Sequence, residues 1–140
     1  MAADPWGLDM AAVKALAADL NRIRGRLQPA MKQVTSKGAL NVKNAAKESI
    51  LAQTSHHFVK QYPNSITYSI TESTGTMVTA EIGPEDSKPQ GPLGILLEYG
   101  TPKNGGPYPH VVPSLEAEAE SYEQYLGDAA RDAVFGEDGS

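Results

Sequence analysis

The sequence contains no cysteine among its 140 residues, and aromatic residues make up only 6% of it. Without cysteine, the chain can form neither disulfide bonds nor thiolate metal sites. No apolar run approaches the roughly 20 residues that a bilayer-spanning helix needs, so we expect no membrane partner. Phosphate-binding glycine loops, serine nucleophile elbows and Walker-type lysines are also missing. We therefore expect no enzyme activity, no catalytic residue and no cofactor.

The composition is that of one globular domain, because 40% of the residues are hydrophobic and 21% are charged. We expect a single domain over residues 1–140, with a short N-terminal arm (1–8) and a flexible polar tail (136–140). The only tryptophan, Trp6, lies in the arm and outside any periodic pattern. Such a residue either packs on its own domain or anchors a partner, so Trp6 is a possible partner anchor.

The formal net charge of −5 hides two halves of opposite sign. Residues 1–62 contain nine Lys/Arg and four Asp/Glu, which gives +5, whereas residues 63–140 contain three bases and thirteen acids, which gives −10. A basic front and an acidic back can attract copies of the same chain or unlike neighbours. The alternative is that two solvated faces simply differ in charge.

The first half of the chain predicts two helices. Asp9 is a suitable N-cap for the first helix. Apolar residues then recur at spacings of three and four, which places them on one helical stripe: Val13, Leu16, Leu20, Ile23 and Leu27. Pro29 either kinks this helix or opens a second one, which runs to about Gln53. For that second helix we predict these inner positions: Met31, Val34, Val42, Ala46 and Ile50.

The second half predicts a β-hairpin and a last helix. Residues 65–72 alternate between apolar and polar side chains, a turn follows at 73–75, and residues 77–82 return. Val111 and Val112 are candidates for a third strand, and Ser114 for the N-cap of the last helix, although Pro113 fits its first turn equally well. We expect an α+β fold, in which two N-terminal helices and a C-terminal helix pack on a small antiparallel β-sheet.

The most constrained segment runs from residue 96 to residue 115. Gly100 follows an apolar run and can adopt a positive φ. Four prolines then fix φ and push each preceding residue toward extended backbone: Pro102, Pro107, Pro109 and Pro113. A segment of this kind holds one shape with little regular structure. We expect its residues to form a structural or interface motif, made of Glu98, Tyr99, Gly100, Thr101, Tyr108, Pro109 and Pro113.

This segment also resembles a known family. Residues 97–101 read Leu-Glu-Tyr-Gly-Thr, and after a Gly/Pro loop residues 109–115 read Pro-His-Val-Val-Pro-Ser-Leu. Together they resemble the signature of the HK97 gp10-like family of tailed-phage proteins. One departure is Tyr108-Pro109-His110, where the family often has Pro-Phe.

The resemblance implies a structural virion protein at the head–tail junction of a long-tailed phage. Such a neck or tail-completion subunit is made in the host cytoplasm. It would assemble as a homo-oligomeric ring, expected to be a hexamer. The ring would join the connector or stopper protein to the tail terminator and tail-tube proteins, and genomic DNA would pass through without sequence-specific binding. The alternative within this class is a tail terminator that caps the tube.

Two further hypotheses come from the residues themselves. A small hydrolase or nuclease would need His56, His57, His110 and Glu98 to converge, and a zinc site would need more ligands than this set supplies. A DNA-binding adaptor would use the basic helices, although the chain is acidic overall. For Glu98, which lies between Leu97 and Tyr99, two readings remain: an acid with a raised pKa, or a structural carboxylate that accepts backbone N–H bonds from the loop after it.

Overall fold

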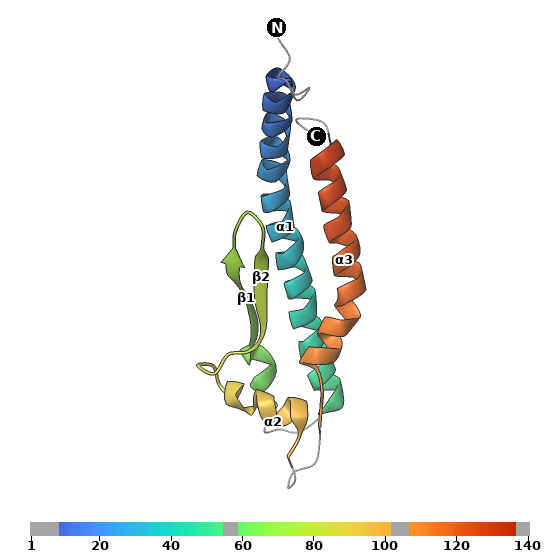
Figure 1. The fold of residues 1–140 in the computed structure, drawn as a ribbon. Helices are drawn as coiled ribbons and strands as arrows, with labels where there is room; N and C mark the ends of the chain where they lie inside the picture. Colours follow the sequence, from blue (N-terminus) through green and yellow to red (C-terminus); the bar gives the residue numbers. More distant parts are fainter. Residues whose placement is uncertain (1–8, 55–58, 102–106, 137–140) are drawn as a thin grey trace.

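A computed structural model describes residues 9–54, 59–101 and 107–136. Its described elements are three α-helices, two 3-10 turns and one two-stranded antiparallel sheet (Figure 1). The fold class is α+β, as the sequence predicts. In chain order the elements are α1 (Met10–Gln53), η2 (Tyr62–Ser65), β1 (Ile66–Ser73), β2 (Val78–Pro84), η3 (Gly91–Leu93), α2 (Gly94–Tyr99) and α3 (Val111–Phe135).

Helix α1 is one continuous helix of 44 residues, so the prediction of two N-terminal helices is wrong. Asp9 caps it as expected, because its side chain accepts a hydrogen bond from the Ala11 N–H at 2.9 Å. Pro29 removes one backbone donor from the helix interior, which ordinarily favours a kink. Two contacts just before the proline tie this part of the helix to other elements: Gln28 donates to the Ser73 hydroxyl, and Arg26 donates to the Gly136 carbonyl.

The hairpin has the predicted position and pairing. β1 and β2 are antiparallel, with Tyr68 opposite Ile82 and Ile70 opposite Ala80. The predicted third strand is wrong, because Val111 and Val112 form the first turn of α3. The sheet therefore has two strands within the described part of the chain.

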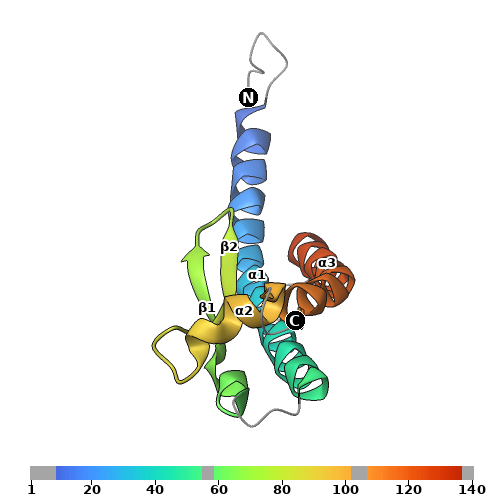
Figure 2. The ribbon, with the colours of Figure 1, turned by 90° about the horizontal axis from the view of Figure 1, so that it is seen from below.

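The hairpin and α3 lie on opposite sides of α1, as two perpendicular views show (Figures 1 and 2). α3 packs mainly on α1 rather than on the sheet, which differs from the expected arrangement. Tyr122 of α3 bonds to Thr35 through the two hydroxyls at 3.1 Å, and Asn41 donates to Glu118 at 3.0 Å. The long helix is thus the scaffold on which the other elements are placed.

The core lies where the C-terminal half of α1 meets η2 and α2. Its buried members come from α1, from residues 59–66 and from α2: Ala46, Ile50, Val59, Tyr62, Ile66 and Leu97. The predicted inner positions Val42, Ala46 and Ile50 are confirmed as buried. The stripe in the first half of α1 is not part of this core, since Val13, Leu16 and Leu20 are 41%, 59% and 57% exposed. No helix among the described residues is long and apolar enough to cross a membrane.

Two glycines of α1 provide a matched test of the helix packing. A Cβ at Gly38 would lie 3.2 Å from the Tyr122 ring, whereas a Cβ at Gly25 meets nothing within 4 Å. We predict that Gly25→Leu raises the free energy of unfolding by up to about 1 kcal/mol, because leucine favours helix. Gly38→Leu lowers it by about 1–3 kcal/mol through overpacking. Urea denaturation measures both, and equal effects would contradict the packing of α3 on α1.

Candidate functional site

The short helix α2 carries Glu98 and Tyr99 of the Glu-Tyr-Gly step. A Cβ at Gly94 would lie 2.3 Å from the Pro84 ring, so glycine lets the helix start directly against the end of the hairpin. The helix ends at Gly100, which has the predicted positive φ of 78°. The Gly100 N–H donates to the Leu96 carbonyl at 2.8 Å, which closes the last turn.

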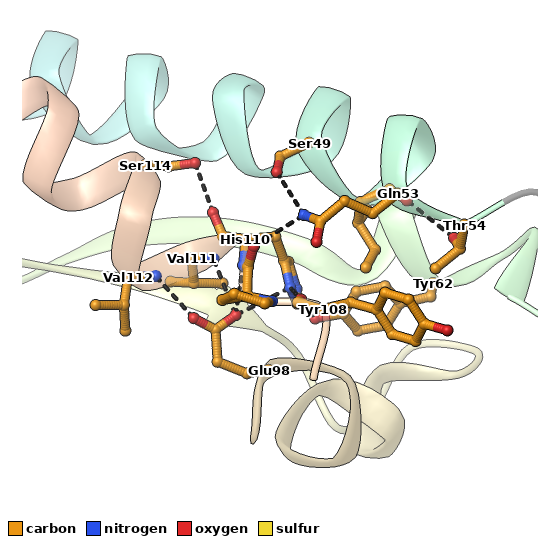
Figure 3. Close-up of polar contacts among 12 residues, drawn as sticks. Ser49, Gln53, Thr54, Tyr62, Glu98, Tyr108, His110, Val111, Val112 and Ser114 are labelled. Carbon is orange, nitrogen blue, oxygen red and sulfur yellow. Dashed lines mark hydrogen bonds and ion pairs between the residues drawn. The ribbon is translucent and has the colours of Figure 1, made fainter. Parts of the chain in front are cut away.

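The Glu98 carboxylate accepts three backbone N–H bonds from the start of α3 (Figure 3). Oε2 accepts from His110 at 2.8 Å and from Val111 at 3.0 Å, and Oε1 accepts from Val112 at 2.9 Å. The next residue, Pro113, has no N–H to satisfy. Residues 110–113 therefore leave no backbone donor without an acceptor, and a negative charge lies at the positive end of the helix.

His110 joins this carboxylate to the core. Its ring is fully buried, with Nδ1 2.8 Å from the Tyr108 carbonyl and 2.9 Å from Glu98 Oε2. Because both of these oxygens accept, Nδ1 carries a proton. Nε2 lies 2.6 Å from the hydroxyl of Tyr62, which is also fully buried. In the neutral ring, Nε2 accepts a hydrogen bond from the Tyr62 hydroxyl, so the three side chains form a buried chain from α2 through His110 to η2.

Further bonds hold the backbone on either side of His110. The Tyr108 N–H donates to the Leu97 carbonyl at 2.7 Å, and Gln53 at the end of α1 donates to the Pro109 carbonyl at 2.8 Å. The Ser114 hydroxyl donates to the His110 carbonyl at 2.5 Å. Ser114 lies inside α3 rather than at its N-cap, which is His110, so of the two open possibilities Pro113 in the first turn is the observed one.

The electrostatics favour an ionised Glu98 and a protonated Tyr62. Burial by itself raises the pKa of Glu98, but the three backbone N–H bonds and the neighbouring His110 outweigh it, and the net pKa is lowered. Burial, and then the nearby Glu98 carboxylate, raise the pKa of Tyr62. The phenol therefore keeps its proton and remains able to donate to His110.

The hydrogen bonds of Glu98, His110 and Tyr62 are all made within the protein. No buried side-chain N or O atom in the described part of the chain lacks a hydrogen-bond partner. Glu98 is 8% exposed, and His110 and Tyr62 are 0% exposed, so no face of the chain Glu98–His110–Tyr62 is open to a substrate. No group of three or more metal-ligating side chains occurs among residues 9–54, 59–101 and 107–136. Of the two readings of Glu98, the geometry matches the structural carboxylate.

The other sequence-predicted site residues have different positions. Tyr99 points away from the network and is 71% exposed, Thr101 is half-buried, and Pro113 is exposed. Of the hydrolase set, His110 and Glu98 come together, whereas His56 and His57 lie outside the described residues. Trp6 lies outside them as well.

Sequence reasoning missed Tyr62 and Gln53 as partners of this site. Tyr62 reaches it across 48 positions and Gln53 across 56, and neither has a local pattern that signals the contact. It also missed Gln90, whose backbone is left-handed at φ 63° and whose side chain accepts the N–H groups of Gln61 and Tyr62. The sequence held one signal for this site. Pro113 in His-Val-Val-Pro marks the first turn of a helix, and the backbone N–H groups before it need an acceptor such as Glu98.

The Glu98 carboxylate and the three backbone N–H groups that it accepts, those of residues 110–112, are called the Glu98 clamp below. Replacing Glu98 by glutamine tests this clamp. The amide has one accepting oxygen and presents N–H groups on the other side, so at least one backbone donor of residues 110–112 loses its acceptor. We predict that Glu98→Gln lowers the free energy of unfolding by about 1–3 kcal/mol. The matched control is Glu116→Gln, an exposed position of α3 that should change it by less than about 0.5 kcal/mol. Equal effects in urea titrations would contradict the clamp.

The lowered pKa of Glu98 predicts a pH dependence of stability. A group whose pKa is lower in the folded state stabilises fully above its unfolded pKa, about 4.3 for glutamate, and loses that contribution as the pH falls through the folded value. The difference in unfolding free energy between the wild type and Glu98→Gln should stay constant above about pH 5 and shrink below about pH 4. A difference that grows on acidification would show that Glu98 is not held in its ionised form.

Comparison with known proteins adds no relative: no protein-family model, no curated protein and no solved structure matches the chain significantly.

Proposed function

We propose that this chain is a structural subunit of the head–tail junction of a long-tailed phage, which assembles as a ring between the connector and the tail tube. The single observation that supports this most is the Glu98 clamp together with the side chains it leaves outside. The residues that resemble the HK97 gp10-like signature are the ones that build the clamp. The polar groups of the clamp, Glu98 and His110, are buried and bonded within the chain, which favours a role in shaping a surface over one in a reaction pocket.

The surface in question is the outer side of α2. Ile95 is 72% exposed, Leu96 is 50% exposed and Tyr99 is 71% exposed. Glu98 and Leu97, on the other side of the same helix, are buried. Three large apolar side chains held outward by an anchored helix are typical of a protein–protein contact, where tyrosine and aliphatic anchors contribute much of the binding energy.

The charge distribution also fits contact between copies. α1 carries eight Lys/Arg and two Asp/Glu, whereas α3 carries one arginine and six Asp/Glu. Each subunit thus has a basic central helix, α1, and an acidic helix, α3, packed on one side of it. In a ring, acidic side chains of α3 in one subunit would meet basic side chains of α1 in the next, and such complementarity sets the order and orientation of neighbours.

The same distribution is suited to DNA passage. An acidic helix that faces a lumen repels phosphate, so DNA would move through without adhering to the wall. The energy of assembly would come from burial of the apolar side chains of α2 against a neighbouring ring, at roughly 25 cal/mol per Å² of apolar surface removed from water.

Native mass spectrometry tests this proposal. Mixed with the connector and tail-tube proteins of the same genome, the full chain should give a closed ring of identical subunits bound to them. We predict that the double variant Ile95→Ser, Tyr99→Ser keeps its helix content but loses at least tenfold in affinity for the neighbouring ring. Met77→Ser, at a 50% exposed position in the hairpin turn, is the control and should bind as the wild type does.

Two outcomes would contradict the proposal. One is absence of the protein from purified phage particles. The other is substrate turnover by the isolated subunit that Glu98→Gln abolishes.

A further inference from the structure

The N-terminal part of α1 exposes an apolar stripe that none of the elements described above uses. Val13, Leu16 and Leu20 are 41%, 59% and 57% exposed, and Met10 next to them is 56% exposed. With Ile23 and Leu27 they repeat at spacings of three and four. Spacings of three and four then continue the same face of the helix to Met31, Val34 and Gly38.

Further along α1, this face is the one that binds α3. The Tyr122 ring lies against Gly38, and its hydroxyl bonds to Thr35. α3 ends level with Arg26, whose guanidinium donates to the Gly136 carbonyl at 2.7 Å. α1 continues past the end of the hairpin (Figure 2). The apolar seam between α1 and α3 therefore extends beyond the second helix that fills it, within the part of the chain that the structure describes.

The exposed part of the seam has the pattern of a coiled coil. Val13, Leu20 and Leu27 occupy one core position of a heptad, and Leu16 and Ile23 occupy the other. Ala12 and Ala17 flank the core positions, and their small side chains allow a second helix to approach closely. A stripe of this kind is complementary to another copy of itself.

We propose that two copies of this chain pair in solution through the N-terminal parts of their α1 helices, in antiparallel orientation. The direction follows from the position of α3. The α1 helix of a parallel partner would continue along the seam into the place that α3 already occupies. The α1 helix of an antiparallel partner instead extends past the N-terminal end of α1, where α3 does not reach. Full overlap of the two exposed stripes sets Val13 of one copy against Ile23 of the second copy, and Leu16 against Leu20.

The charges at the ends of the pair support this register. It brings the position of Asp9 in each copy close to that of Arg26 in the other, so each end of the pair joins opposite charges. Near the centre the two Asp19 carboxylates approach one another, but each is already paired with Arg22 of its own helix at 3.2 Å. The pairing is therefore an isologous contact with two-fold symmetry. It is independent of the proposed ring function, because it concerns a different surface.

Sedimentation of the full-length chain tests the pairing. The wild type should change from one chain to two as its concentration rises, and the double variant Leu16→Glu, Leu20→Glu should stay a single chain at concentrations at least tenfold higher. Leu51→Glu is the control, since Leu51 lies on the same helix and is 59% exposed, as Leu16 is. Circular dichroism checks that both variants keep the helix content of the wild type.

Engineered cysteines test the direction, and the absence of native cysteine makes each of them unique. In the antiparallel register the two copies of position 17 lie only about 3 Å apart along the axis, from two residues at 1.5 Å each, so Ala17→Cys should form a disulfide-linked dimer under oxidation. Position 13 lies about 15 Å from its counterpart in that register, from ten residues at 1.5 Å each. Val13→Cys should therefore stay unlinked.

Three results would overturn the proposal. The first is a wild type that remains a single chain at every concentration, which would leave a helix of another protein as the occupant. The second is cross-linking of Val13→Cys but not of Ala17→Cys, which would show parallel helices. The third is loss of the dimer in the Leu51→Glu control alone.

Discussion

The structure depends on one carboxylate that satisfies the start of a helix from another part of the chain. Glu98 accepts the backbone N–H groups of His110, Val111 and Val112, and Pro113 needs no acceptor. α3 thereby begins without a capping side chain of its own. Because Glu98 lies on α2, this contact fixes where α3 starts relative to the hairpin and the core. His110 and Tyr62 continue the same network into the interior, next to the end of α1.

The network explains why an acid, a histidine and a tyrosine in mutual contact support a structural role here. These residue types are also common in catalytic sites, but here each buried side-chain N or O atom has a hydrogen-bond partner within the described part of the chain. Burial raises the cost of leaving any of them unpaired, so removal of one partner affects all three. The outer side of α2 differs, since its apolar side chains have no internal role in the described structure. The proposed ring contact and the buried network are therefore two sides of one short helix.

Local patterns in the sequence predicted much of the fold. Alternation of residues 65–72, the Asp9 cap and the spacing of Val42, Ala46 and Ile50 each depend on neighbours a few positions away, and the structure confirms them. Two predictions failed for a reason that lies outside local pattern. Pro29 was expected to kink the first helix or to open a second one, but α1 continues through it as one helix, with contacts to β1 and to the end of α3 close by. Val111 and Val112 were expected to extend the sheet, but the Glu98 carboxylate takes the N–H groups that a strand would have used.

The candidate site was predictable only in part for the same reason. Glu98 and Gly100 were recognisable because an acid between apolar neighbours and a glycine after an apolar run both restrict the local backbone. Tyr62 and Gln53 were not, because their contacts join segments 48 and 56 positions apart and need the folded arrangement of α1 and η2. The exposed stripe of α1 was predictable as a helical pattern. That no described helix covers its first half depends on where α3 ends, level with Arg26, and this is a property of the folded arrangement.

Amide hydrogen exchange at the start of α3 tests the central claim most directly. If Glu98 holds this helix end, the N–H groups of His110, Val111 and Val112 exchange slowly in the wild type, and in Glu98→Gln they exchange at least tenfold faster while the middle of α3 is unchanged. Equal exchange rates of these three amides in the two proteins would contradict the account.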